Sequence, residues 1–326
     1  SFKPGYLAGL GLGYDDLTKV KPDIILTSVT DFGQTGPHSG WQGSDLVDIA
    51  MSGIMTMSGF VDREPYRPYP SQAYYCGGLE GAIGTLMALT YRDLHDEGQW
   101  VEVSIQESLS MCQETAMQTW DFHHRARRRV GGLPSMLRAV GLQEMADGYV
   151  YTMIGAGGAG APLSELVTWM DREGAAGDLV TDGTLGQLDE VAAAGREMLR
   201  DPQVMMRMMG TIGKVMDQAV PFFKSMPKQQ AYIEGQTIGF LIGPANDPKD
   251  ILENEQHNAR GWFQDVPHPE LGKTIRFPGM PYHLSDSPAR VRRRAPFVGE
   301  HNADIYEKEL GLSPDRVVEL KASGAI

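Results

Sequence analysis

The stretch QAYYCGGLEGAIG, residues 72–84, decides the fold, because glycine and alanine recur along it and leave little side-chain bulk. We predict the end of a strand at its beginning and a helix of small residues over Gly78–Leu94, which Asp96 and Gly98 terminate. Such a helix can lie very close to a neighbouring element, since glycine has no Cβ. Close packing of this kind is typical of an α/β fold in which helices cover a sheet.

Two apolar segments, one on either side of this helix, are predicted to be strands of that sheet. Ile24–Val29 is an apolar, β-branched run bounded by turn residues, which is typical of a buried parallel strand. Trp100–Ile105 alternates as half-buried strands do. The loop Thr30–Pro37 follows the first strand at its carboxyl end, where open α/β sheets place their ligands.

The remaining pattern predicts helices on both sides of a change in composition at Val130–Pro134, which we interpret as a flexible link. Before the link, the predicted helices cover residues 7–17, 44–57 and 106–129. After it, we predict a strand at 148–154, a mostly helical stretch at 163–232 with breaks at Pro221 and Pro227, a strand and loop at 237–246, a short helix at 250–258, a returning segment from 274 and a helical tail at 305–326. We therefore expect residues 1–130 to belong to a large α/β domain, residues 131–284 to form a smaller, mostly helical domain with linkers, and residues 285–326 to return to the large domain.

Charge and composition argue against several classes of partner. The chain carries 42 acidic against 29 basic residues, a net charge of −13, which disfavours binding to nucleic acid or to an anionic membrane. No apolar run is long enough to span a bilayer, and no leader pattern opens the chain. Two cysteines are too few for a disulfide framework, so we expect a cytoplasmic protein. His123 and His124 have no metal-ligand spacing with other residues, so we expect no bound metal.

Several short motifs, taken in order along the chain, resemble those of family III CoA-transferases, the group that includes formyl-CoA and carnitine CoA-transferases. These motifs are Phe2–Gly5 with Leu10–Tyr14, Phe32–Pro37, Ala50–Gly53, Gly98–Glu107, Asn258–Phe263 with His268–Gly272, Gly299–Asn302 and Glu309–Ser313. The resemblance covers nearly the whole chain. It implies a Rossmann-like domain with a parallel sheet, a smaller domain, and two subunits interlocked like links of a chain. It also places Ser1 well inside the family's usual chain, so we expect the front part of the Rossmann-like domain to be missing here.

The resemblance also marks the positions that would carry the chemistry. In this family an aspartate four residues before the second glycine of the turn carries the acyl group and then CoA, and the matching position here is Tyr74. A phenol with a pKa of about 10 cannot form those intermediates. Gly9 stands where the family usually has an arginine that helps hold the CoA phosphates. Phe2 and Lys3 match family residues that lie near the CoA adenine and ribose.

We therefore expect a non-catalytic subunit of a heteromeric CoA-transferase. The implied partner is a paralogous subunit that bears the aspartate and binds the coenzyme A thioester as a substrate, with no permanently held cofactor. The resemblance suggests succinyl-CoA as the donor and an aryl-substituted succinate as the acceptor. Two alternatives stay open: an active homodimer that uses a displaced nucleophile, and a binding or scaffolding protein without transferase activity. We interpret the nearby Cys76 and Glu80 as a buried thiol and a local ion-pair residue.

Overall fold

The computed structural model describes residues 1–326 apart from residues 70, 114, 130, 132–137, 155–159 and 195–200. It forms two compact units, Ser1–Pro244 and Ala245–Ile326. The first unit contains two apolar cores, one under a parallel strand pair and one among helices and an antiparallel sheet. The domain boundaries predicted after residues 130 and 284 stay predictions.

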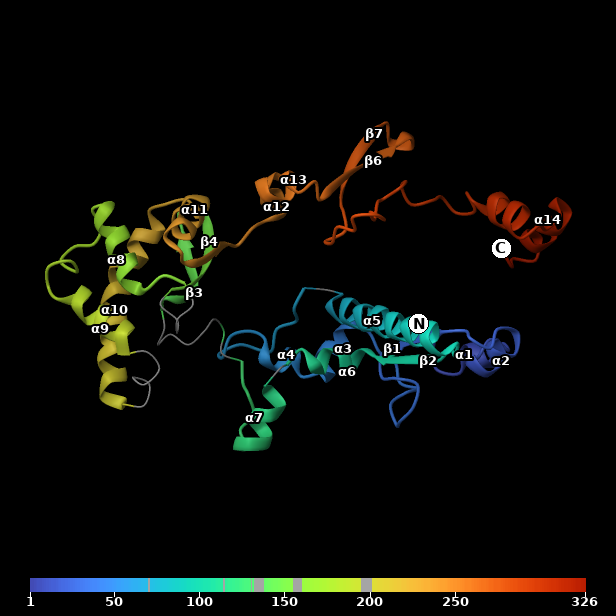
Figure 1. Ribbon diagram of the computed structural model, residues 1–326, viewed down its shortest axis with the longest axis horizontal. Helices are drawn as coiled ribbons and strands as arrows, with labels where there is room; N and C mark the ends of the chain where they lie inside the picture. The colour runs from blue at the N-terminus through green and yellow to red at the C-terminus, as the bar shows by residue number, and fades with distance from the viewer. Residues whose placement is uncertain (70, 114, 130, 132–137, 155–159, 195–200) are drawn as a thin grey trace. The chain divides into compact units, whose positions relative to one another are not determined.

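The two predicted strands of the first core are confirmed, and they pair directly. β1 (Leu26–Thr30) lies parallel to β2 (Trp100–Ser104), with Leu26 opposite Trp100 and Thr30 opposite Ser104. All the residues between them, including a long helix, form the crossover that a parallel pair requires. The described residues therefore show the parallel sheet and covering helices that the sequence predicted (Figure 1).

The small-residue helix is α5 (Gln72–His95), and its glycines lie against the strand pair and the element that follows it. A Cβ added at Gly77 would lie 2.7 Å from Ile105 Cγ1, and one added at Gly84 would lie 2.7 Å from Val101 Cγ1. Such distances are too short for a carbon–carbon contact, so the glycines are what allows the close approach predicted from the sequence.

The predicted start of this helix is wrong. We expected a strand end before Gly78, but α5 already begins at Gln72, directly after Ser71, whose backbone is left-handed with φ of 71°. No side chain in the local sequence caps the first turn. Instead the carboxylate of Asp45, distant in sequence, accepts a hydrogen bond from the Ala73 N–H at 3.0 Å. A helix start fixed by a tertiary contact leaves no signal in the neighbouring residues.

Glycines and a left-handed residue also divide the other predicted helices of this region. The helices are α1 (Tyr6–Gly9), α2 (Tyr14–Val20), α3 (Asp45–Met51), α4 (Ile54–Met57), α6 (Ile105–Met111) and α7 (Ala116–His123). Gly11 separates α1 from α2 with φ of 71°, and Gly53 separates α3 from α4 with φ of 90°. The single helix predicted over residues 106–129 is wrong, because it is divided into α6 and α7 and stops where His124 takes φ of 51°.

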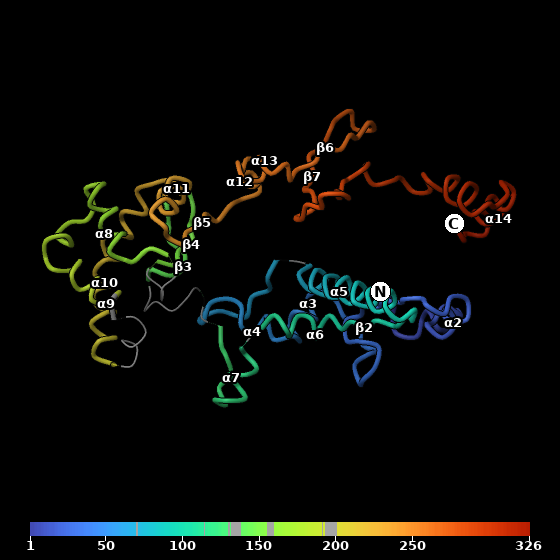
Figure 2. Tube along the Cα trace, in the orientation of Figure 1, coloured from blue at the N-terminus to red at the C-terminus, as the bar shows by residue number. Residues whose placement is uncertain are grey.

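The second core contains an antiparallel sheet that the sequence only partly predicted. β3 (Val140–Met145), β4 (Gly148–Met153) and β5 (Leu241–Pro244) pair in that order, and Figure 2 traces the three strands side by side. β4 and β5 lie within predicted strand segments, whereas β3 was not predicted. Helices α8 (Leu163–Arg172), α9 (Thr184–Ala194), α10 (Pro202–Lys224) and α11 (Lys228–Ile238) complete this core.

The predicted helix break at Pro221 is wrong, and the one at Pro227 is confirmed. α10 continues through Pro221, while Pro227 precedes α11 as its N-cap residue. A proline inside a helix removes one backbone hydrogen bond, but Phe222 and Phe223 on the same turn are buried and hold that turn in place.

The second unit combines short helices, a hairpin and a helical tail. α12 (Pro248–Glu253) and α13 (Glu255–Ala259) replace the single helix predicted at 250–258, because Asn254 ends the first and caps the second. β6 (Phe263–His268) and β7 (Lys273–Pro278) form an antiparallel hairpin around the short helix η3 (Pro269–Leu271). The tail contains η4 (Ala303–Glu309) and α14 (Pro314–Ala322), which confirms its predicted helical character.

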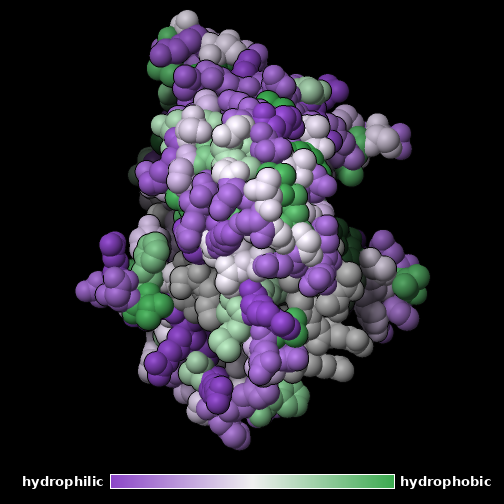
Figure 3. Space-filling view, turned by 90° about the vertical axis from the view of Figure 1, so that its left-hand side faces the viewer, coloured by the Kyte–Doolittle hydropathy of each residue, from purple (hydrophilic) through white to green (hydrophobic). Residues whose placement is uncertain are grey.

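The surface is predominantly polar on the face that Figure 3 shows, where apolar residues appear as small patches among hydrophilic ones. None of the helices in the described ranges is both long and apolar enough to cross a membrane.

Candidate functional site

A pocket of about 590 Å³ lies at the carboxyl end of β1, where the sequence predicted a ligand site. It brings Tyr74 together with Phe2 and Lys3, which lie far from it in the sequence, and the family resemblance had singled out all three. Its lining residues are Ser1, Phe2, Lys3, Pro4, Val29, Thr30, Asp31, Phe32, Ser39, Trp41, Gln42, Gly43, Tyr74, Gly78 and Ile105.

A second, smaller pocket of about 330 Å³ adjoins the first around the start of the chain. The two share the lining residues Ser1, Phe2, Lys3, Val29 and Thr30, so Phe2 and Lys3 lie between them. An elongated ligand with a charged group fits such an arrangement better than a compact one, because both pockets border the same lysine. Gly9 ends α1 and lines neither pocket.

Phe2 offers an aromatic face and Lys3 a positive charge at this junction. The Phe2 ring stacks on Tyr6 with centroids 5.3 Å apart and remains 57% exposed, so one ring face is available to a planar ligand group. The Lys3 ammonium can donate to phosphate or carboxylate oxygens as a point charge.

Tyr74 lies in the first turn of α5 and its phenol makes one specific hydrogen bond. The backbone N–H of Asp45, the first residue of α3, donates to Tyr74 Oη at 3.1 Å. The side chain is 49% exposed and borders the pocket. The phenol oxygen therefore serves as a hydrogen-bond acceptor that links two helix starts.

Asp45 connects the start of α3 to Arg67 and to the start of α5, next to Tyr74. Its buried carboxylate accepts from Arg67 Nη2 at 2.6 Å through Oδ2 and from the Ala73 N–H at 3.0 Å through Oδ1. Burial raises the pKa of Asp45, but the bonds from Arg67, Ala73 and Ser71 outweigh burial, and the pKa lies below its usual range. The sequence analysis did not predict that Asp45 would anchor α5.

The carboxyl group of Asp48 interacts electrostatically with those of Asp31 and Asp45. Asp48 is fully buried, and no described group donates a hydrogen bond to either of its oxygens. Burial first, and then the neighbouring charge of Asp31, raise the pKa of Asp48 to about 7. Asp31 follows β1, lines the larger pocket, and lies so close to Gly43 that an added Cβ would be 2.2 Å from Asp31 Cγ.

Sequence reasoning missed this pair, although a signal was present. The helix segment Asp45–Met51 reads DLVDIAM, and an aspartate one turn into an otherwise apolar helix is a departure worth noting. Among the described lining residues of the larger pocket, Asp31 is the carboxylate, whereas neither Cys76 nor Glu80 lines it. The described residues include no group of three or more histidine, cysteine, aspartate or glutamate side chains placed to hold a metal.

Known proteins similar to this chain share both sequence and fold. Over all 326 residues, the chain is 30% identical to "Succinyl-CoA:(R)-benzylsuccinate CoA-transferase subunit BbsE" from Thauera aromatica, and the match covers 75% of that protein. It is 24% identical to "Succinyl-CoA--L-malate CoA-transferase beta subunit" from Chloroflexus aurantiacus, again over the whole chain and 75% of the relative.

The solved structures agree on the fold. A CAIB/BAIF family protein from Brucella suis superimposes with a TM-score of 0.71 at 24% identity, and the match covers 94% of this chain and 73% of that one. The mixed α/β architecture with a parallel sheet and helices is therefore that of this structural group. The model for "CoA-transferase family III" matches residues 1–302, and the chain belongs to that family.

Proposed function

We propose that this chain is a subunit of a heteromeric CoA-transferase whose acyl-carrying aspartate resides on a paralogous partner subunit. The observation that carries this proposal is the place of the Tyr74 side chain at the pocket. The motif resemblance puts Tyr74 at the family's aspartate position, and the Tyr74 phenol borders the pocket and accepts a hydrogen bond from the Asp45 backbone. A phenol held in this way can shape a pocket and support a helix start, but it cannot pass on an acyl group and then CoA.

The chemistry would take place on the partner's aspartate. Its carboxylate attacks the thioester carbonyl of the donor, an acyl anhydride forms and CoA leaves as the thiolate. The thiolate then attacks the aspartyl carbonyl of the anhydride, which gives an enzyme-bound thioester and releases the donor's acid. The acceptor carboxylate attacks the aspartyl thioester and forms a second anhydride, and CoA leaves again as the thiolate. The thiolate then attacks the acceptor's carbonyl in that anhydride, which gives the acceptor's CoA thioester and frees the aspartate carboxylate. Backbone N–H groups near the aspartate would stabilise the oxyanions that develop.

The names of the relatives support succinyl-CoA as the donor and a substituted succinate as the acceptor. The relative from Thauera aromatica is named as one subunit of an enzyme for succinyl-CoA and (R)-benzylsuccinate, and the relative from Chloroflexus aurantiacus as the beta subunit of one for L-malate. We propose an aryl-substituted succinate as the acceptor here, and an interlocked pair of unlike subunits located in the cytoplasm as the assembly. The aromatic side chains Phe32, Trp41 and Tyr74 around the pocket suit an aryl group.

A second candidate function rests on Asp31. Because this carboxylate lines the same pocket as Tyr74, it could act as a displaced nucleophile in a homodimer of this chain. Burial and the neighbouring charge raise the pKa of Asp48 beside it to about 7, which reduces the charge repulsion between the two carboxyls near neutral pH.

The decisive experiment is to purify the chain from its source with whatever subunit accompanies it and to incubate the complex with succinyl-CoA. Hydroxylamine or borohydride then traps acyl and thioester intermediates, and the intact mass of each subunit shows where they form. We expect a modified partner and an unmodified chain, for wild type and for Tyr74→Phe alike. A chain that purifies alone, takes up the label and loses it in Asp31→Asn would establish the second candidate. A chain that purifies without a partner, takes up no label and does not bind CoA would instead be a binding or scaffolding protein.

Coenzyme A binding at Lys3 can be tested separately. If Lys3 contacts a phosphate of CoA, Lys3→Ala should weaken CoA binding on the order of tenfold, because a charge-assisted hydrogen bond is lost. Isothermal titration of the purified complex measures this change. Lys273→Ala, at an exposed lysine that starts β7 and lines neither pocket, is the matched control. Equal affinities for both variants would show that Lys3 does not contact CoA.

A further inference from the structure

The two cysteines of the chain, which the proposed function does not use, lie next to each other. Cys76 in α5 and Cys112 at the end of α6 are 36 positions apart in sequence, yet their Sγ atoms are 3.9 Å apart. Both are free thiols in the structure, Cys112 exposed and Cys76 half-buried. They are the whole cysteine content of the protein, so no other thiol of this chain competes for either one.

The packing of α5 against α6 fixes this proximity. Gly77, next to Cys76, lies against the Ile105 side chain at the start of α6, where a Cβ would have no room. Cys76 packs against the buried cluster that contains Ile105 and Leu109. Cys112 caps the C-terminus of α6, and its thiol donates to the Ser108 carbonyl at 3.6 Å. A small rotation of side chains on two well-packed helices would therefore bring the sulfurs to bonding distance.

The surroundings assign different roles to the two thiols. Burial, then the neighbouring Cys112 thiol and the charge of Glu80, raise the pKa of Cys76, so this thiol is rarely ionised at neutral pH. Cys112 is exposed, and an oxidant in solution can reach it. Oxidation would therefore begin at Cys112, and Cys76 would resolve the product.

We propose that Cys76 and Cys112 form a reversible dithiol–disulfide site that reacts with a peroxide. The Cys112 thiolate attacks one peroxide oxygen and becomes a sulfenic acid, and the other oxygen leaves as water after protonation. The Cys76 sulfur then attacks the sulfenic sulfur, and the hydroxyl group leaves as a second water. Two thiols lose two electrons and two protons in total, and the peroxide is reduced to two waters. An external dithiol reverses the reaction by exchange.

The bond would connect the two helices whose first turns border the larger pocket. Cys76 lies between the lining residues Tyr74 and Gly78 of α5, and α6 begins with the lining residue Ile105. This site is independent of which subunit performs the transfer, so its test does not depend on the proposed function.

The test uses the full chain with any subunit that copurifies. The protein is treated with hydrogen peroxide in modest excess, the remaining thiols are blocked, and the intact mass and an unreduced proteolytic digest are measured. We expect the chain to become lighter by two hydrogen atoms, a Cys76–Cys112 linked peptide to appear, and dithiothreitol to restore both thiols.

Cys76→Ser and Cys112→Ser separate the two roles. With Cys76→Ser, the oxidised Cys112 lacks its resolving thiol and should be trapped as a dimedone adduct. With Cys112→Ser, the remaining Cys76 should react far more slowly than Cys112 does in the first variant. The proposal is wrong if wild type keeps both thiols under conditions that oxidise free glutathione. It is also wrong if the only linkage found joins two chains.

Discussion

Replacing Asp48 by asparagine is expected to stabilise the protein at about pH 8 and to change its stability little in mild acid. The folded protein holds the pKa of Asp48 at about 7, well above its ordinary value of 3.8, because the carboxyl is fully buried beside Asp31. The contribution of Asp48 to the free energy of unfolding is therefore fully present below about pH 4 and is lost as the pH rises to about 7. Asparagine does not titrate, so Asp48→Asn places no buried charge beside Asp31 at any pH.

The size of this effect follows from the pKa difference. A shift of one pKa unit corresponds to about 1.4 kcal/mol. The free energy of unfolding of Asp48→Asn relative to wild type should therefore grow by up to about 3 kcal/mol between about pH 5 and about pH 8. Urea denaturation at the two pH values measures it. Asp304→Asn is the control, because that exposed carboxylate pairs with Lys308, which lowers its pKa, so its replacement should bring no gain at high pH. A pH-independent effect of Asp48→Asn would contradict the argument.

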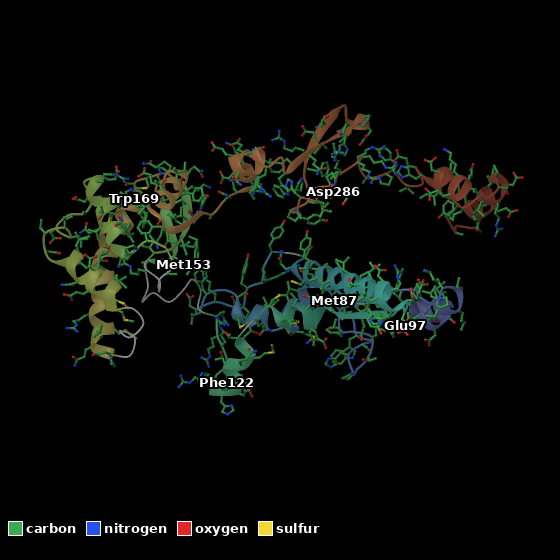
Figure 4. The ribbon with its side chains drawn as sticks, in the orientation of Figure 1. Met87, Glu97, Phe122, Met153, Trp169 and Asp286 are labelled. Atoms are coloured by element: carbon green, nitrogen blue, oxygen red, sulfur yellow. The ribbon has the colours of Figure 1, made fainter. Side chains whose placement is uncertain are left out.

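Replacing Trp169 by alanine should cost about 3–5 kcal/mol in the unfolding free energy of the second core, the range for truncating a buried large aromatic residue. Trp169, labelled in Figure 4, lies in α8 and is 1% exposed. Its ring contacts those of Phe222, Phe223 and Phe240 at centroid distances of 5.2, 6.1 and 6.3 Å. Its indole N–H also donates to Glu234 Oε2 at 2.9 Å. The substitution thus removes ring contacts and a hydrogen bond together.

The same substitution at an exposed tryptophan provides the matched control. Trp120 in α7 is 57% exposed, so Trp120→Ala should change stability by no more than about 0.5 kcal/mol. Trp169→Phe keeps most of the ring contacts, so its loss of unfolding free energy should lie between the losses for Trp169→Ala and Trp120→Ala. Denaturation followed by circular dichroism measures all three. Similar losses for Trp169→Ala and Trp120→Ala would show that the aromatic cluster does not stabilise this part of the chain.

The sequence predicted those elements whose signals are local. The run at Ile24–Val29 and the alternation at Trp100–Ile105 became the parallel pair, because burial and pleating act directly on these residues. β3 was missed, since VGLQEM is short and includes a glycine. The hairpin of β6 and β7 was missed too, because Pro267 lies inside β6 and proline argues against a strand.

The site was predictable only in part, for the same reason. Phe2, Lys3 and Tyr74 could be singled out through the motifs around them, and the structure brings all three to one pocket. The polar Asp48 inside an apolar helix was a signal that was missed, but its approach to Asp31 does not follow from their separation in sequence. The start of α5 was misplaced because Asp45, which holds it, belongs to another helix.

The hydrogen bond between the Asp45 N–H and Tyr74 Oη has a consequence for substitutions at position 74. An aspartate side chain is several atoms shorter than that of tyrosine, so the same backbone could not give it this contact. Any shorter side chain at this position, aspartate included, would therefore remove one hydrogen bond between the starts of α3 and α5 and leave the one between the Asp45 carboxylate and the Ala73 N–H.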